Sequence, residues 1–428
     1  MSQERRFPGR EHWQLWLAVA AFCAAAVWFY GQVLWPSATN LTHGFGAYYS
    51  ASRLLSNGDI SADIYDPAYF RPIVRADSGG AADDIFNANP PTTTIMFLPL
   101  SFLPIEQARM VWTVMGTIFL ALGLGLLLWG FGVPFQTPNQ RTLWFIVMTL
   151  ALLFQPVIQN FLWGQAYVLV FFLSSVTTAA FFKAQASDQP NHKIESAGGI
   201  ALAASLLLKT AGWPLLILFL WLRKWRFLAW IIGFGAVVFL ATLPIFRLEM
   251  WQVYGRLLSE VSSSPMNCVP AYQTTRSLLC HLFAPNVYWQ DAAAAGIKIP
   301  DLVTGTYFVL GIGCILGLLR LARKRPNAAF VGFVCWSILF LPLGEVHQHT
   351  VLLIPLVWLI VKWSEHGRFG RTALLLAVVC YLIPFPMNAP QFQSGMLALL
   401  AYPYVAGAWL IFLGILWDHK SEILPGWG

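Results

Sequence analysis

The residues of this chain that could carry chemistry lie in a few polar stretches between long apolar ones. The longest such stretch runs from Asn40 to Arg109 and holds six carboxylates between Asp59 and Asp84. The aromatic and arginine side chains that share it are Phe45, Tyr48, Tyr49, Tyr65, Tyr69, Phe70, Phe86, Arg53, Arg71 and Arg75. A polar, aromatic-rich insertion after a first apolar segment is where a membrane enzyme would hold its reacting groups.

Within this insertion, two places could supply a general base. His43 could take a proton or orient a hydroxyl, although a lone histidine is more often structural. Asp63 and Asp66 lie in the segment ADIYDP, where an Asp-Pro pair is also a common start of a turn. Asp83 and Asp84 are compatible with a loop that they simply solvate.

Two basic residues outside the insertion could bind an anion. Ionisable groups at membrane depth are costly and are therefore functional candidates. Lys209 ends the apolar run ALAASLLLK and could contact a lipid phosphate, or it could be a lysine at a helix end that extends its ammonium to the interface. Arg276, in PAYQTTRSLLCHLF, could pair with a phosphate through two hydrogen bonds, or be an ordinary interfacial arginine.

A third polar group consists of Glu345, His347 and His349, between two apolar runs. The histidines could bind a phosphate as cations, relay a proton or ligate a metal, and the alternative is a polar turn. A metal site is disfavoured because residues two apart do not share a helix face.

The elements that must position these residues are those of a helical membrane protein. Of the 428 residues, 57% are hydrophobic and 11% are charged, whereas soluble domains carry about 25% charged residues. Apolar runs recur that can each cross a hydrocarbon core of about 30 Å. We therefore predict an all-α polytopic membrane protein with about 12 transmembrane helices, at residues 13–34, 106–130, 142–158, 164–182, 197–209, 212–222, 226–246, 301–319, 328–344, 347–361, 371–386 and 395–417.

We expect these helices to form a single integral membrane domain over residues 1–428. A large first extracytoplasmic loop at 36–105 carries interfacial helices, and a second occupies 247–300. The apolar segment Pro90–Pro104 is too short to span comfortably, so it should lie in the interface or re-enter the membrane.

The distribution of basic residues predicts the orientation. In this arrangement 17 of the 26 Lys and Arg residues are cytoplasmic, in agreement with the positive-inside rule. The net charge of +7 therefore does not indicate nucleic-acid binding. Both termini should be cytoplasmic and the candidate site extracytoplasmic, and the basic inner loops fit a bacterial plasma membrane.

Motifs for metals and nucleotides are missing from the sequence. It has no CxxC or His/Cys cluster for zinc, no Walker loop and no GxGxxG segment before a helix, so we expect no metal and no cofactor. Cys268 and Cys280 both fall in the second outer loop, where the compartment permits a disulfide. The sequence leaves their pairing open.

Several segments, taken in order, resemble glycosyltransferase family 87. HGFGAYYSASRLLSNGDISADIYDPAYF and FNANPPTTTIMFLPLSFLPIEQARMVW are similar to the first outer loop of that family, and LWGQAYVLVF, LLLKTAGWPLLIL with RKWR, YQTTRSLLCHLF and HQHTVLLIPL follow in the same order. The resemblance implies a GT-C-like fold that uses no nucleotide or metal. It implies inverting transfer of a hexose or pentose, as in mannosyl- and arabinosyltransferases, from a polyprenyl-phosphate donor to a glycolipid or glycan hydroxyl at the outer membrane face.

The resemblance also implies roles for single residues. Lys209 and His349 would contact the donor phosphate, with His349 matching better than His347, and Arg276 would assist. The side chains expected to line the substrates are Tyr48, Tyr49, Asn89 and Gln165.

One departure from the family pattern concerns the base. The family usually has an acidic residue directly before Phe45, which looks like its general base, but Gly44 stands there in this chain. The base would then be one of His43, Asp63, Asp66 and Glu345. Two alternatives remain: an inactive GT-C-like scaffold, suggested by Gly44, and a transporter or flippase of an amphipathic anion, for which the chain lacks an evident repeat.

Overall fold

The computed structural model describes residues 10–86, 89–187, 189, 191–263, 268–283, 300–387, 389–392 and 396–420. Over these residues the chain is built from helices, and its one strand-like pairing is an isolated antiparallel bridge between Tyr272 and Glu345. The α-helices are α1 (Arg10–Phe29), α2 (Trp35–Thr39), α3 (His43–Asn57), α4 (Pro67–Asp77), α5 (Thr93–Phe97), α6 (Ile105–Gly130), α7 (Pro138–Leu153), α8 (Gln155–Trp163), α9 (Tyr167–Ala186), α10 (His192–Lys209), α11 (Pro214–Trp221), α12 (Trp225–Ser263), α13 (Thr275–Phe283), α14 (Pro300–Ala322), α15 (Pro326–Leu339), α16 (Leu353–Val361), α17 (Arg368–Leu382) and α18 (Pro403–Asp418).

Shorter helical turns connect them. A π-helical turn, η1 (Tyr30–Leu34), joins α1 to α2. The 3-10 helices are η2 (Ala62–Tyr65), η3 (Leu98–Phe102), η5 (Val346–Leu352), η6 (Trp363–Glu365), η7 (Pro390–Phe392) and η8 (Met396–Ala401).

The apolar helices confirm a multi-pass helical membrane protein, but not the predicted number of spans. Five helical segments among the described residues are long and apolar enough to cross a membrane, and the bent pair α7–α8 makes six if it is one span. Three predicted spans, at 328–344, 347–361 and 395–417, fall on apolar helices of 10–17 residues. Such a helix covers at most about 26 Å, which is less than the hydrocarbon core.

The structure shows a break at two predicted boundaries. The span expected at 142–158 is interrupted at Phe154, where α7 and α8 meet at 52°, because Pro156 favours the start of a new helix. The second outer loop was expected to begin at 247, and α12 kinks at Arg247 (φ 50°) before it continues to Ser263.

Close helix packing builds the interior around α9. Gly123 and Gly130 lie seven residues apart on one face of α6, and a Cβ atom added to Gly130 would approach the Cα atom of Ala179 in α9 to 2.8 Å. Small residues of this kind let two helix backbones approach closely. α9 also packs along α10, so α9 lies between α6 and α10 in the bundle.

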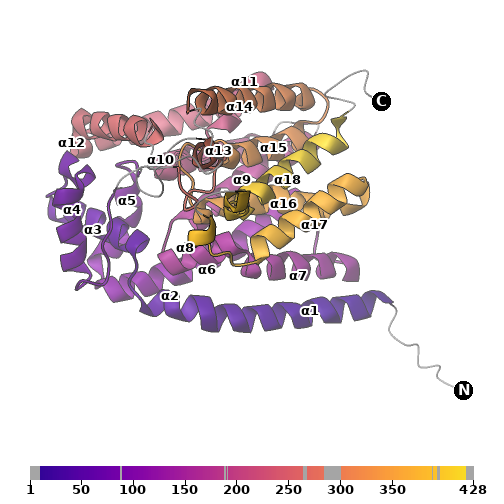
Figure 1. The fold of residues 1–428 in the computed structure, drawn as a ribbon, viewed down its shortest axis with the longest axis horizontal. Helices are drawn as coiled ribbons and strands as arrows, with labels where there is room; N and C mark the ends of the chain where they lie inside the picture. The colour runs from indigo at the N-terminus through magenta and orange to yellow at the C-terminus, as the bar shows by residue number, and fades with distance from the viewer. Residues whose placement is uncertain are drawn as a thin grey trace, which may run out of the picture.

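The segment predicted as the first outer loop folds into a helical cap at one end of the bundle. Helices α3, α4 and α5 gather there beside the far end of α12, while α1 begins at the opposite end (Figure 1). The segment Pro90–Pro104 forms the two short helices α5 and η3. In the second loop Cys268 and Cys280 form a disulfide; residues 264–267 and 284–299 of that loop lie outside the described residues.

Candidate active site

Lys209 is positioned by contacts between the first loop and the end of α10. The last carbonyl groups of a helix have no partner within it, and here the hydroxyls of Thr92 and Thr93 donate to two of them. These bonds dock the Asn-Pro-Pro-Thr-Thr segment against α10. Asn89 is thereby placed to accept a hydrogen bond from the Lys209 ammonium.

Two tyrosine rings face the same ammonium. The Lys209 Nζ atom lies 4.9 Å from the ring centroid of Tyr48 and 5.7 Å from that of Tyr167, and aromatic faces attract cations. The Tyr48 hydroxyl donates to the Oε1 atom of Gln165 at 2.7 Å. Four predicted residues, Tyr48, Asn89, Gln165 and Lys209, therefore meet at one place.

Two carboxylates balance this ammonium. Asp84, from the first loop, and Glu345, which follows α15, both interact favourably with Lys209. Burial raises the pKa of Asp84, against the lowering effects of the Ile85 N–H, His43 and Lys209. Burial also raises the pKa of Glu345; Lys209 opposes this rise and the charge of Asp84 adds to it. Carboxyl groups with raised pKa can exchange protons nearer to neutral pH.

Glu345 is held by its neighbours but is not sealed off. The antiparallel bridge to Tyr272 fixes its backbone, and its Oε2 atom lies 3.4 Å from the Nδ1 atom of His347. Half of the Glu345 side chain remains accessible, at 50%, although protein atoms surround it. The His347 ring packs against Tyr167, 5.3 Å away, and lies within electrostatic range of Lys209.

His43, Asp83 and Asp84 have quite different surroundings. The exposed His43 ring stacks on Trp163, and its Nδ1 atom lies 2.9 Å from the main-chain oxygen of Asp83. The Asp83 carboxylate accepts a hydrogen bond from Arg75 at 2.6 Å, which lowers its pKa. The prediction that both aspartates simply solvate the loop does not describe Asp84, whose carboxylate is largely surrounded by protein and interacts electrostatically with Lys209 and His43.

Gly44 leaves no room for the acidic residue that the family pattern would place there. A Cβ atom at this position would lie 2.7 Å from the main-chain oxygen of Trp163 and closer still to the Nε2 atom of Gln165. Any larger side chain would displace Gln165 from Tyr48. Asp84, which interacts with the adjacent His43, instead brings a carboxylate to this region.

Three predicted residues have local structural partners instead. Asp66 caps α4 by accepting a hydrogen bond from the Ala68 N–H, and Asp63 accepts one from the Ser61 hydroxyl; both aspartates are exposed. The Tyr49 hydroxyl donates to the main-chain oxygen of Leu103. The structure gives no contact between these three residues and Lys209.

His349 also has structural partners within the protein. It is fully buried, its Nε2 atom lies 2.9 Å from the main-chain oxygen of Gln273, and its Nδ1 atom lies 2.9 Å from the Tyr381 hydroxyl. Both ring nitrogens are thus occupied by the protein. The resemblance favoured His349 over His347, whereas in this structure His347 is the histidine that lies next to Glu345 and interacts electrostatically with Lys209.

Arg276 lies apart from this group, in an apolar pocket of about 660 Å³. The pocket wall includes Trp213, Tyr307 and Trp336, and its charged member among the described residues is Arg276. The Nη1 atom of Arg276 is buried without a hydrogen-bond partner, and burial lowers the pKa of this guanidinium. Trp213 ends the short connection that starts at Lys209, so one connection borders both the pocket and the buried cluster.

Sequence reasoning missed Asp84 and Tyr167. Nothing in the pair Asp83-Asp84 reveals that one carboxylate turns outward to Arg75 and the other inward. Tyr167 lies two residues after Gln165, in a segment that the sequence had already singled out. Asp84, Lys209, Glu345, His347, Tyr48, Tyr167, Asn89 and Gln165 are called the Lys209 cluster below.

The fold and the cluster define a helical membrane protein with a lysine held between aromatic rings and carboxylates. The family model of glycosyltransferase family 87 matches residues 87–344, which is more than half of the chain and includes Asn89, Gln165, Tyr167 and Lys209 of the cluster. The chain belongs to glycosyltransferase family 87. This confirms the predicted family and the interpretation of the chain as a glycosyltransferase.

Two solved structures are similar in overall arrangement. The crystal structure of ArnT from Cupriavidus metallidurans in the apo state is 16% identical, with 95% of this chain and 77% of that chain covered and a TM-score of 0.41. ArnT bound to undecaprenyl phosphate is 14% identical, with the same coverage and a TM-score of 0.44. With TM-scores below 0.5, these likenesses support no conclusion about this chain. No curated protein matches it.

Proposed function

We propose that this protein transfers a sugar from a polyprenyl-phosphate donor to a hydroxyl group of a glycolipid or glycan at the extracytoplasmic face of the membrane. The observation that carries the proposal is the Lys209 cluster, in which a lysine with protein partners on several sides is placed beside two carboxylates of raised pKa. Family membership supports the sugar-transfer class. The donor lipid, the acceptor and the sidedness are part of the proposal.

The reaction needs two kinds of group, and the cluster has both. An acceptor hydroxyl must lose its proton as its oxygen forms a bond to the anomeric carbon. The bond from that carbon to the phosphate oxygen breaks, and the phosphate gains negative charge as it leaves. Attack from the side opposite the phosphate inverts the anomeric centre.

We assign the base to Asp84. Its raised pKa brings it closer to the pH at which a general base works well, and it lies beside His43, next to the position where the family places its acidic residue. Asp63 and Asp66 do not serve, because each has a local structural partner. Glu345 shares the Lys209 charge with Asp84 and contacts His347, so we place it on the donor side.

Lys209 is proposed to contact the leaving phosphate. A fixed cation stabilises charge that develops in the transition state, and the tyrosine rings and Asn89 hold this ammonium in place before the substrate arrives. His347 would assist when protonated. Tyr48, Tyr167 and Gln165 would line the sugar.

The Arg276 pocket is proposed to receive the proximal part of the prenyl chain. Its wall is apolar and aromatic, as an isoprenoid requires, and the unpartnered Nη1 atom of Arg276 can bind a phosphate oxygen. The connection from Lys209 to Trp213 would then lie beside the point where the phosphate joins the prenyl chain.

A transfer assay tests this function directly. Purified protein in nanodiscs would be given a panel of radiolabelled polyprenyl-phosphate pentoses and hexoses, with membrane glycolipid extract as acceptor. Label that moves from one donor supports the class and identifies the sugar. Folded protein that transfers label from none of them would refute the function.

Two neighbouring variants test the base in the same assay. Asp84→Asn should lower kcat by about 10²–10⁴-fold, the usual contribution of a general base. Asp83→Asn is the matched control, because it removes the adjacent carboxylate, which is paired with Arg75 and points away from Lys209. Equal activity of the two variants would remove Asp84 from the mechanism.

A further inference from the structure

A second charged cavity lies at the opposite end of α9 from the Lys209 cluster. Tyr167, the first residue of α9, belongs to the cluster, and Lys183, in its last turn, lines a cavity of about 660 Å³. α9 has 20 residues, about 30 Å of helix, and is one of the helices long and apolar enough to cross a membrane. The two sites therefore lie near opposite membrane faces.

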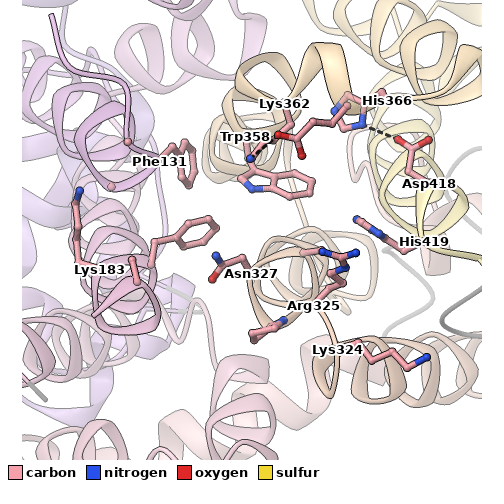
Figure 2. Close-up of a pocket in the computed structure, with 17 residues that line it drawn as sticks. Phe131, Lys183, Lys324, Arg325, Asn327, Trp358, Lys362, His366, Asp418 and His419 are labelled. Carbon is pink, nitrogen blue, oxygen red and sulfur yellow. Dashed lines mark hydrogen bonds and ion pairs between the residues drawn. The ribbon is translucent and has the colours of Figure 1, made fainter. Parts of the chain in front are cut away.

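This cavity, called the basic pocket below, is surrounded by the ends of several helices (Figure 2). Its basic side chains are Lys183, Lys324, Arg325 and Lys362. The two carboxylates in its wall already have cationic partners: Glu365 accepts from Lys362 at 2.7 Å, and Asp418 lies 2.6 Å from the Nδ1 atom of His366. The pocket therefore has an excess of positive charge.

The start of α15 adds hydrogen-bond donors to this charge. Arg325, its N-cap residue, makes no side-chain cap, so the first-turn N–H groups of Asn327 and Ala328 lack intrahelical acceptors. Both residues line the pocket. A helix N-terminus beside basic side chains is suited to a phosphate group. The buried Oδ1 atom of Asn327 has no hydrogen-bond partner and could accept a bond from a hydroxyl group of the ligand.

The remaining wall is aromatic. Phe131 and Phe182 pack edge to face with centroids 4.8 Å apart, and Trp358 forms part of the same lining. A free inorganic ion would gain nothing from these rings, whereas an amphiphile at the membrane surface would. Basic pockets between helices at the cytoplasmic side of membrane proteins commonly bind anionic lipid head groups.

We propose that the basic pocket binds the head group of an anionic phospholipid, with its phosphate on the α15 N-terminus and the surrounding Lys and Arg side chains. A hydroxyl-bearing head group such as phosphoglycerol would also satisfy Asn327. This site is separate from the Lys209 cluster and does not depend on the sugar-transfer reaction proposed above.

The test measures the melting temperature of the purified protein in nanodiscs. Discs of phosphatidylcholine would contain a graded fraction of phosphatidylglycerol. A ligand that binds the folded state raises the melting temperature, so it should rise with that fraction. Lys324→Gln/Arg325→Gln should need about thirtyfold more phosphatidylglycerol for the same rise. The rise is measured from each protein's own melting temperature in pure phosphatidylcholine, so a change in basal stability does not enter the comparison.

A matched variant separates a site from general surface charge. Lys224→Gln/Arg368→Gln removes the same charge from the connection between α11 and α12 and from the start of α17, neither of which lines the pocket, and it should keep the wild-type lipid response. If both double variants lose the response equally, the effect is one of overall charge and the proposal is overturned.

Soluble phosphates identify the source of the bound group. Glycerol phosphate and inorganic phosphate, added to pure phosphatidylcholine discs, should leave the melting temperature unchanged at concentrations where the lipid acts. If either raises it, and phosphatidylglycerol does not, the pocket takes a soluble phosphate and the lipid assignment is wrong.

Discussion

Charged side chains are arranged differently around the two ends of α9. At Tyr167 the Lys209 ammonium lies among two carboxylates, an amide and two aromatic rings, and both signs of charge are held close together. At Lys183 the basic side chains outnumber the carboxylates, which already have their own cationic partners. The arrangement around Lys209 can move a proton and stabilise a leaving anion. The arrangement around Lys183 can only bind an anion.

The difference teaches how to recognise a reaction site among several polar places in a membrane protein. Positive charge alone is common near helix ends, where lysine and arginine set the orientation. Holding carboxylates beside a cation away from water is costly, and burial raises the pKa of both carboxylates near Lys209, which directs attention to that end of α9.

The largest expected difference between the two ends of α9 is in the effect of replacing Lys209 or Lys183 on turnover. Lys209→Ala should lower kcat by about 10²–10³-fold, as expected for the loss of a fixed group that stabilises transition-state charge. Lys183→Ala, at the other end of α9, should leave turnover unchanged. Lys209→Arg should recover part of the activity, because it keeps the charge but not its compact geometry. Wild-type turnover of Lys209→Ala would remove the phosphate contact from the mechanism.

A smaller effect is expected from one methyl group at Gly44. The Cβ atom of Gly44→Ala would press on Gln165 and on the carbonyl oxygen of Trp163. Overpacking costs about 1–3 kcal/mol, and the lower figure carried into the barrier corresponds to about a fivefold loss of turnover. Gly233→Ala is the control, because a Cβ atom there meets nothing within 4 Å. Equal turnover of the two variants would contradict the tight packing at Gly44.

The pH dependence sharpens the assignment of the base. Asp84 must be ionised to accept a proton, so kcat/KM should fall as the pH drops through its pKa. Because burial raises that pKa, the fall should begin at a higher pH than for an ordinary aspartate. The charge of His43 lowers the pKa of Asp84, so His43→Ala should move the acid limb to higher pH. An unmoved limb would show that Asp84 is not the titrating base.

The sequence predicted the class of fold and all of the Lys209 cluster except Asp84 and Tyr167. Hydropathy and charge identified a multi-pass helical protein, and Lys209 was found because an ionisable residue at the end of an apolar run is unusual. Tyr48, Asn89, Gln165 and Glu345 were predicted as site residues, and the structure gathers them around it. The predicted number of spans was not confirmed, because the helix breaks before Pro156 and several other apolar runs form helices of 10–17 residues, which a hydropathy pattern does not register.

The choice between similar residues also required the structure. His347 and His349 are two residues apart, and only their hydrogen bonds separate the histidine held by Gln273 and Tyr381 from the one beside Glu345. Asp83 and Asp84 differ by the direction of one side chain. Such choices depend on tertiary contacts between distant segments, which neither composition nor local pattern contains.

The smallest expected effect concerns stability at the Lys209 cluster. A carboxyl whose pKa is raised in the folded state binds its proton more tightly there, so it stabilises the fold at low pH and loses this contribution as the pH rises through that pKa. Asp84→Asn should therefore melt at a higher temperature than the wild type at neutral pH, and the gap should narrow toward acid pH. Asp83→Asn should show no such gain, because Arg75 stabilises the ionised form. A variant that melts higher and yet transfers no sugar would mean that Asp84 is retained for reaction at a cost in stability, whereas a lower melting temperature would make it a structural residue.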